Sequence, residues 1–507
     1  MQHVTGLDQM FLSYDTMTTN GNIGGIAIFD DDGKGGPKAE PGARLAWLRQ
    51  RVTDRLPTLP PLRWRLAPFA MDTFWVESTV DVDYHVVHVQ LQEPGDEKML
   101  LTYLKRIMGV HLDRTRPMWR LYLIEGLPNG QYAYLFKVHH GLADGSAMWE
   151  ILDHLADHPV TNPEVSEVAP EGPAEIIAGG MKNYLDKPMA LAALQANIGK
   201  WLAERVAEEE VGAIPAMMAR LIPGEMALPF VAFANAIRNQ SVPEIASQRP
   251  VLVPPPSPFN GTTTRNVEIA LVDFALEDLR RAGKAAGGTI NDAVLAITAG
   301  ALRTYMERHG INTSLPLLAS APVSWRTGTE KERWANQIWM LFLQLPTHIT
   351  DPVERLHWAH KSATLAKDNW DRMPLHMLRE ASALMPGAMM ASMGPMMAGM
   401  PAEMMPAIYN VAVSNVKGPR ERPEFGGNPM ARYFVFGFLA PTTGLLVGGQ
   451  SLGDRMIFSL TACRDIVKHL DTLPKLFHDS LAELLKATNS APADSAKASK
   501  AATPAKA

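Results

Sequence analysis

The stretch YAYLFKVHHGLADGSAMWEILDHLADH, Tyr132 to His158, decides the fold of this chain. Its first part alternates in the manner of a β-strand, and the glycine-containing turn GLADG follows. The segment after the turn has helical spacing. It places four apolar side chains on one helix face: Met148, Ile151, Leu152 and Leu155. The order strand, turn, helix predicts a mixed α/β fold in which the strand carries two histidines into the turn.

Those two histidines are the strongest candidates for chemistry. A neutral imidazole takes a proton from a hydroxyl near pH 7, so a histidine at a strand end facing a pocket suits a general base. Adjacent side chains on a strand point to opposite faces, so we expect only one of His139 and His140 to serve the reaction. Asp144 either accepts a ring N–H or pairs with an arginine and holds the turn. Gly141 and Gly145 are expected to supply backbone angles that other residues avoid.

Outward from this stretch, further strand and helix patterns are present, and no repeat of fixed period is visible. Strand patterns at Ile23 to Phe29 and Arg120 to Leu127 precede this stretch, with a hairpin turn at Pro128-Asn129-Gly130, and a second mixed region starts near Thr263. We therefore expect two α/β lobes joined by a connector. The expected parts are an N-terminal lobe at 1–162, a helical, proline-rich connector at 163–258, a C-terminal lobe at 259–486 and a disordered tail at 487–507.

Composition narrows the function classes. The 507 residues are 46% hydrophobic, enough for more than one core, and 48 basic against 53 acidic residues give a net charge of −5. This charge offers no field for gripping polyanions, so nucleic acid is not expected as a partner. Cys463 is the single cysteine and cannot form an internal disulfide, and the first residues lack an export-signal pattern. The sequence thus indicates a reducing, cytoplasmic compartment.

Two proline-broken apolar segments bear on membranes. Eleven of the 28 methionines fall between Met373 and Met405, and Gly212 to Ile237 is similarly apolar. Neither has the roughly 18 unbroken apolar residues of a spanning helix. They are consistent with buried, methionine-padded helices, or with deformable surfaces that accept acyl chains or lie in a membrane interface. Together they favour a protein that meets lipid without crossing it.

The motif around the two histidines and several other segments of the chain resemble a known family. HHGLADG matches the HHxxxDG signature of CoA-dependent acyltransferases, and nearly the whole chain resembles the bacterial wax ester synthase/diacylglycerol acyltransferase family. The supporting blocks are LDQMFLSYDTMTTNGNIGGIAIFD, RPMWRLYLIEGL, GGTINDAVL, SAPVSWR, WANQ and SNVKGP. Three blocks depart from the family pattern, with Met118 for Leu, Ala335 for Gly and Lys417 for Pro.

The resemblance implies two lobes like chloramphenicol acetyltransferase, with a channel between them. His140 would deprotonate an alcohol, whose oxygen then attacks an acyl thioester. Asn291, from the second half, would support the oxyanion, although capping of its own helix is the other interpretation. Asp144 and Asp292 would be structural charges.

The resemblance also implies the substrates. Acyl-CoA is the expected cosubstrate, with no permanently bound cofactor and no metal, and the acceptor is diacylglycerol or a fatty alcohol. The expected location is the cytoplasm, at the inner face of the plasma membrane or on lipid droplets.

Two other functions compete. Gly449 to Gly453 satisfies the G-x-S-x-G pattern of serine esterases around Ser451, but the following RMIFSLTA predicts a hairpin rather than a nucleophile elbow. A catalytically silent lipid-surface protein is the third possibility. His85 and His88 suggest a metal site, but strand spacing places them on opposite faces and favours a structural role.

Overall fold

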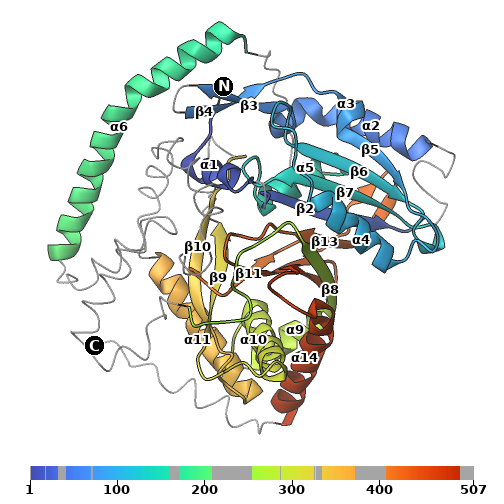
Figure 1. The fold of residues 1–507 in the computed structure, drawn as a ribbon, viewed down its shortest axis with the longest axis vertical. Coiled ribbons are helices and arrows are strands. Elements are labelled where there is room, and N and C mark those ends of the chain that lie inside the picture. The colour runs from blue at the N-terminus through green and yellow to red at the C-terminus, as the bar shows by residue number, and fades with distance from the viewer. Residues whose placement is uncertain are drawn as a thin grey trace.

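The structure is a computed structural model that describes residues 2–16, 19–31, 42–69, 72–159, 171–207, 254–285, 287–324, 326, 334–371 and 407–490. Two lobes lie one above the other, each built on a six-stranded sheet (Figure 1). The α/β fold with two lobes is therefore confirmed. A small third sheet, β1 (Gln2–His3), β4 (Asp72–Glu77) and β3 (Trp64–Phe69), extends the first lobe.

The sheet of the first lobe is buried on both faces. Its order is β12-β13-β2-β7-β6-β5. These strands are β12 (Glu424–Phe425), β13 (Asn428–Phe436), β2 (Asn22–Phe29), β7 (Tyr132–His139), β6 (Trp119–Glu125) and β5 (Val86–Gln90). Every residue of β2 and β7 is buried. The alternating sequence pattern of these strands therefore does not separate a core-facing side from a solvent-facing side. The predicted hairpin between β6 and β7 is confirmed, with the turn at Pro128–Gly130.

Helices cover both faces of this sheet. On one face, α2 (Ala43–Arg55) and α5 (Gly145–Leu155) bury Leu48 and Ile151 against the strands. On the other face, α4 (Glu97–Met108) buries Leu100 and Leu104. The short α1 (Gly6–Ser13) lies beside the end of β7, and α3 (Val82–His85) precedes β5.

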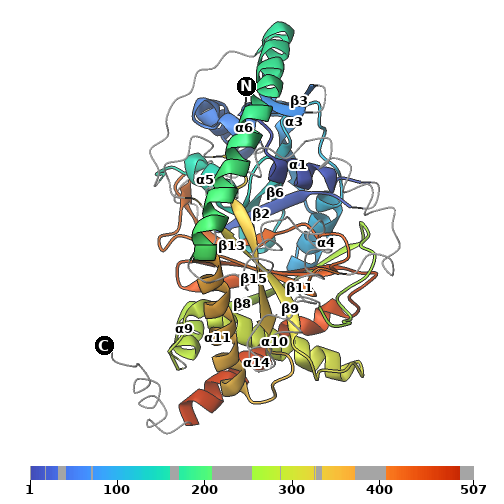
Figure 2. The ribbon, with the colours of Figure 1, turned by 90° about the vertical axis from the view of Figure 1, so that its left-hand side faces the viewer.

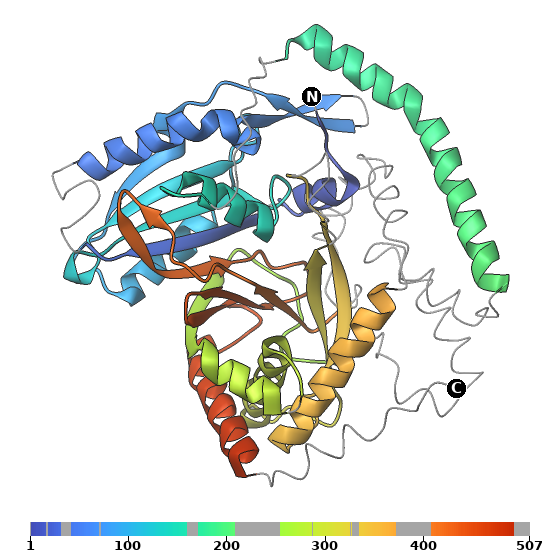
Figure 3. The same cartoon turned by 180° about the vertical axis from the view of Figure 1, so that it is seen from behind.

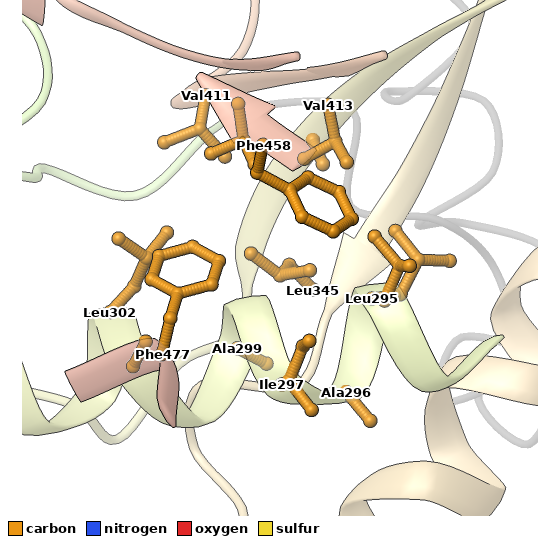
Figure 4. Close-up of a cluster of buried hydrophobic side chains, with 14 of the residues drawn as sticks. Leu295, Ala296, Ile297, Ala299, Leu302, Leu345, Val411, Val413, Phe458 and Phe477 are labelled. Carbon is orange, nitrogen blue, oxygen red and sulfur yellow. The ribbon is translucent and has the colours of Figure 1, made fainter. Parts of the chain in front are cut away.

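The second lobe has one layer of helices on its sheet. The strand order is β10-β9-β11-β14-β15-β8. The strands are β10 (Ile338–Leu345), β9 (Leu317–Ser324), β11 (Val411–Val416), β14 (Leu445–Leu452), β15 (Arg455–Cys463) and β8 (Val267–Ala275). The helices are α9 (Leu276–Ala285), α10 (Ile290–Arg308), α11 (Pro352–Asp371) and α14 (Leu473–Ser490). Figure 4 shows Leu295 and Leu302 of α10 facing Phe458 of β15, in a cluster of almost wholly buried side chains.

The first lobe includes a strand from the second half of the chain, which the sequence did not indicate. β13 lies in the second half of the sequence but pairs with β2 in the sheet of the first lobe. Ile269 and Ile457 of the second sheet also join the hydrophobic cluster around α4. The two lobes consequently pack against each other, and Figure 3 shows both from behind.

The connector contributes one long helix. α6 (Pro173–Ala207) lies on the outside of the molecule (Figure 2), where Ile176 packs against the small sheet. The two apolar, proline-broken segments lie outside the described residues, and so does the tail from residue 491. Helix α14 continues to Ser490, so the first four residues of the predicted tail are helical, because the helix runs on past the last apolar contact.

Within the described ranges, no helix taken singly has both the length and the apolar character needed to cross a bilayer. Among the described helices, one bent pair, α9 and α10, meets the length and composition criteria together.

Candidate active site

The turn after β7 is built by close packing against α1. The backbone N–H of His140 donates to the carbonyl of Gly21 (2.8 Å), which fixes the end of the strand. A Cβ on Gly141 would lie 2.9 Å from Leu12 Cγ and 3.0 Å from the carbonyl oxygen of Asp8. The expectation that Gly141 and Gly145 supply unusual angles is wrong, because neither has a positive φ. Gly141 is needed for the close approach of α1, whereas a Cβ on Gly145, at the start of α5, would make only an ordinary contact with Val416 at 3.8 Å.

The ring of His140 lies between two aromatic side chains. Phe11 of α1 stacks on it with ring centroids 4.0 Å apart, and Phe438 meets it edge-on at 5.3 Å. Burial lowers the pKa of His140 to about 4, although the nearby Asp144 charge acts in the opposite direction. The imidazole is therefore neutral at pH 7. The residue keeps some exposed surface, and its Nε2 makes no hydrogen bond with the described residues.

Asn336, two residues before β10, brings the second lobe to this ring. Its Oδ1 lies 3.0 Å from His140 Nδ1, and its Nδ2 donates to the carbonyl oxygen of His140 (2.6 Å). The same Nδ2 donates to Asp8 Oδ1 (2.6 Å), which also accepts the backbone N–H of Asn336 (3.2 Å). One amide side chain thus joins the turn after β7, α1 and the second lobe.

Asp144 holds the turn and the helix after it. Its Oδ1 accepts the backbone N–H groups of Ser146 (3.0 Å) and Ala147 (2.9 Å), so Asp144 is the N-cap of α5. Of the two partners that the sequence left open, the structure shows an arginine: Arg326, just after β9, donates to both carboxylate oxygens at 2.8 and 2.6 Å. The backbone N–H of Gln337 also donates to Asp144 Oδ2 (3.2 Å).

His139 points away from His140 and is completely buried. Its Nδ1 accepts the backbone N–H of Gly141 (3.0 Å), and its Nε2 lies 3.4 Å from Asp15 Oδ2. An acceptor at Nδ1 places the ring proton on Nε2, facing the carboxylate. The arrangement supports the backbone of the turn rather than a reacting group.

Asn291 and Asp292 open α10 in the second lobe. The N-cap is Thr289, which forms a capping box with Asp292, so Asn291 is not the cap. Asp292 also lies 2.9 Å from His360 Nδ1. Within the described part of the chain Asn291 makes no hydrogen bond to the His140 ring, and the second-lobe asparagine that does so is Asn336. Support of an oxyanion by Asn291 stays a prediction.

The residues of the two competing sites have structural roles. Ser451 lies in β14, opposite Met456 in the predicted hairpin, and its Oγ accepts the N–H of Gly418 (3.0 Å). A hairpin strand is not a nucleophile elbow. His85 Nδ1 donates to the carbonyl of Trp119 (2.8 Å), His88 pairs with Glu125, and the described residues hold no cluster suited to a metal.

A cavity opens at the lobe interface beside the site. It is small, about 30 Å³ and partly open to solvent, and lies between the start of β2, the start of β8 and the segment after β13. Its lining includes Phe438, the ring that packs edge-on against His140. His140 and Asn291 are not among its lining residues, so a continuous channel to the base stays a prediction.

Sequence reasoning missed the residues that surround the base. Asn336 lies in the WANQ block and Asp8 and Phe11 in the LDQMF block, so the signal was present in the matched segments. Arg326 ends the SAPVSWR block. Nothing in the sequence spacing indicates that the first two blocks meet at His140 or that the third reaches Asp144.

Comparison with known proteins places these features in a family context. The model for the wax ester synthase/diacylglycerol acyltransferase catalytic domain matches residues 4–294, and the model for the C-terminal domain matches 334–485. A putative diacylglycerol O-acyltransferase of Mycobacterium tuberculosis is 27% identical over 97% of this chain and 92% of its own. An O-acyltransferase of Acinetobacter baylyi is 27% identical over 93% of this chain and 94% of its own.

Solved structures have the same fold. The wax ester synthase/diacylglycerol acyltransferase from Marinobacter aquaeolei aligns with a TM-score of 0.64 at 21% identity, over 96% of this chain and 100% of its own. The starter condensation domain of rhizomide synthetase, solved with C8-CoA, aligns with a TM-score of 0.55 at 12% identity, over 97% of this chain and 95% of its own.

Proposed function

This chain belongs to the wax ester synthase/diacylglycerol acyltransferase family and is an O-acyltransferase, and from this premise we propose that it moves a long acyl chain from coenzyme A to an alcohol at His140. The observation that carries the proposal is the geometry of that ring. Nδ1 faces the oxygen of Asn336, so Nε2 carries the lone pair, and His140 as a residue is only partly buried.

The chemistry needs a single base. Nε2 of His140 takes the proton of the acceptor hydroxyl as its oxygen attacks the thioester carbonyl carbon. The tetrahedral intermediate then collapses, the C–S bond breaks, and the leaving thiolate takes the proton from the imidazolium. The products are an ester and free coenzyme A. No acyl-enzyme is required when both substrates are held at one base.

The proposed substrates follow from the relatives' names and from the surroundings of the base. The acyl donor is acyl-CoA, and the acceptor is diacylglycerol or a fatty alcohol. Phe11 and Phe438 give the site apolar walls that suit such chains. Both acceptors present a hydroxyl on an apolar body, so the same base serves either.

The test measures both halves of the reaction. Purified protein receives palmitoyl-CoA with dioleoylglycerol or hexadecanol, and free thiol is followed while triacylglycerol and wax ester are separated by thin-layer chromatography. Replacing His140 with Ala removes the base and should lower the rate about 10²- to 10⁴-fold. His478→Ala, an exposed histidine on α14, is the control.

Two outcomes would contradict the proposal. The first is a His140→Ala enzyme that still consumes the thioester at the original rate. The second is an activity that is lost in Ser451→Ala and does not depend on coenzyme A, which would point to a serine esterase.

We also propose that the enzyme is cytoplasmic and works at a lipid surface, the inner face of the plasma membrane or a lipid droplet. Support comes from α6. Six of the eight exposed large hydrophobic side chains in the described ranges lie on this helix: Ile177, Met181, Tyr184, Leu185, Met189 and Leu191. Steps of four, three and seven residues put Ile177, Met181, Tyr184 and Leu191 on one face.

The chemistry of this face favours lipid over a protein partner. It combines flexible aliphatic side chains with a tyrosine, as helices that lie in a membrane interface do. The acidic residues Glu175 and Asp186 fall on the opposite side of the helix by the same spacing. The acceptors proposed above are themselves dissolved in such a surface.

Vesicle co-sedimentation tests this placement. Vesicles of phosphatidylcholine, phosphatidylglycerol and dioleoylglycerol should bind the wild type, and the pair Met181→Glu and Leu191→Glu should lose most of that binding. Leu315→Glu, an equally exposed apolar position outside α6, should bind normally. Equal binding by the α6 variant would reject the proposal. The proposal would also be rejected if the wild type is a dimer in the absence of lipid and the α6 substitutions dissociate that dimer, because the face would then join two copies.

A further inference from the structure

A buried carboxylate is linked through one side chain to His140, the base of the proposed reaction. Asp8 of α1 is 1% exposed, and its Oδ1 accepts two hydrogen bonds from Asn336, one from the side chain and one from the backbone. Asn336 in turn faces Nδ1 of His140. Three segments distant in sequence therefore form a chain of contacts from a buried carboxylate to the imidazole.

The orientation of the Asn336 amide follows from its neighbours. Asp8 Oδ1 and the carbonyl oxygen of His140 are both acceptors, and both lie 2.6 Å from the same atom of the amide. That atom must be the NH₂ nitrogen, which leaves the oxygen toward His140 Nδ1. An oxygen there accepts a proton only from Nδ1–H. The base nitrogen is consequently Nε2.

Resting on the function proposed above, we propose that Asp8 is a positioning residue for catalysis, which acts through Asn336 to hold His140 in the tautomer with a free Nε2. The relay also requires both lobes, since Asp8 and His140 belong to the first and Asn336 to the second. The general base is thus ready only when the lobes are docked.

The charges around the relay are consistent with this role. Asp144 and His139 are the titratable groups that act on His140, and Arg326 neutralises Asp144. Burial raises the pKa of Asp8 to about 6 against the opposing hydrogen bonds from Asn336 and Thr5. Oδ1 of Asp8 accepts a hydrogen bond in either protonation state, so the amide keeps its orientation across this range.

The structure offers a matched control for Asp8. Asp8 also closes the capping box of α1, where its Oδ2 accepts the N–H of Thr5 and Thr5 Oγ1 accepts the N–H of Asp8. Thr5→Ala opens the same box but leaves the contacts to Asn336. A loss caused only by a weaker α1 would appear equally in Thr5→Ala and Asp8→Ala.

The first experiment compares kcat and KM for these variants with palmitoyl-CoA and hexadecanol. Asp8→Ala should lower kcat at least tenfold, with KM for palmitoyl-CoA within about twofold, because the amide can then rotate and release the tautomer. Asp8→Asn retains an accepting oxygen and should recover most of that loss. Thr5→Ala should stay within about threefold of the wild type.

The second experiment exchanges the two side chains. In the double variant Asp8→Asn with Asn336→Asp, a carboxylate faces His140 Nδ1 and favours the imidazolium. The acid limb of kcat/KM should therefore move up by at least one pH unit, while the protein still melts cooperatively. A purely structural role would leave the acid limb where it is.

The outcomes are separable. Asp8→Ala at wild-type kcat, Thr5→Ala as impaired as Asp8→Ala, or an unmoved acid limb in the exchange variant each overturn the relay. His140→Ala is measured in parallel. If that variant stays active, the proposed base is wrong; if it is inactive while Asp8→Ala is unaffected, only the relay fails.

Discussion

Individual side chains show how the interior of the first lobe is used. Lys137 and His139 lie on one face of β7, and both are almost completely buried. Lys137 Nζ donates to the carbonyls of Ile107 and Val110 at the end of α4. The ammonium satisfies backbone acceptors that the helix leaves open.

Lys137 gives a prediction for stability against pH. Burial lowers its pKa in the folded protein to about 7, from 10.5 in a free lysine, although the Asp15 charge opposes the shift. Between these values the unfolded chain binds the proton and the folded chain does not, so this residue adds stability as pH rises. The melting temperature of the wild type should rise from pH 7 to 9.5 relative to Lys137→Met. Parallel curves for the two proteins would contradict this.

At the scale of elements, one carboxylate organises the start of α5. Asp144 caps the helix and pairs with Arg326, which arrives from beyond β9. Asp144 is 1% exposed, so the ion pair is largely removed from water. Asp144 of the HHxxxDG motif therefore caps the start of α5 and also joins the two lobes.

Asp144→Ala should be strongly destabilising. It removes the cap, about 0.5–2 kcal/mol, and leaves Arg326 partly buried without its carboxylate, about 3–5 kcal/mol. Urea unfolding should show the midpoint of Asp144→Ala well below the wild type. Ser146→Ala, at an exposed position of the same helix start, should shift it little. Removing Arg326 as well, as Arg326→Met, should recover part of the loss, and additive losses would argue against the pair.

At the scale of the whole molecule, the lobes cannot be separated along the sequence. β13 supplies a strand to the first sheet, and Tyr433 on it packs so tightly over Gly25 that a Cβ there would lie 2.1 Å from the phenol oxygen. The domain boundaries predicted from the sequence, with lobes at 1–162 and 259–486, stay a prediction. In space, the first lobe contains residues from both halves.

A fragment of residues 1–162 should therefore not fold by itself. Without β13 the fully buried β2 becomes an exposed apolar edge, which favours aggregation. Appending residues 422–438 to this fragment through a flexible linker should improve its solubility and restore a cooperative melt. A soluble 1–162 fragment with a cooperative transition of its own would show that the exchanged strand is dispensable.

The sequence by itself determined the elements and the motif. Strand and helix patterns placed β6, β7 and α5 correctly, because period and turn chemistry are local properties. The same local reasoning identified the hairpin that removes Ser451 as a nucleophile. It also separated His139 from His140, since neighbours on a strand face opposite ways.

Only the tertiary structure decided what surrounds His140. Phe11, Asn336 and Phe438 reach the ring from α1, from the segment before β10 and from the segment after β13, and Asp8 of α1 contacts Asn336. Their meeting depends on how the lobes dock and on the exchange of β13, and no local pattern encodes either. Hydrogen bonds between residues more than 190 positions apart, such as that between His140 and Asn336, arise from the packing of whole lobes. Their partners are therefore found in the three-dimensional structure and not from the spacing of residues in the sequence.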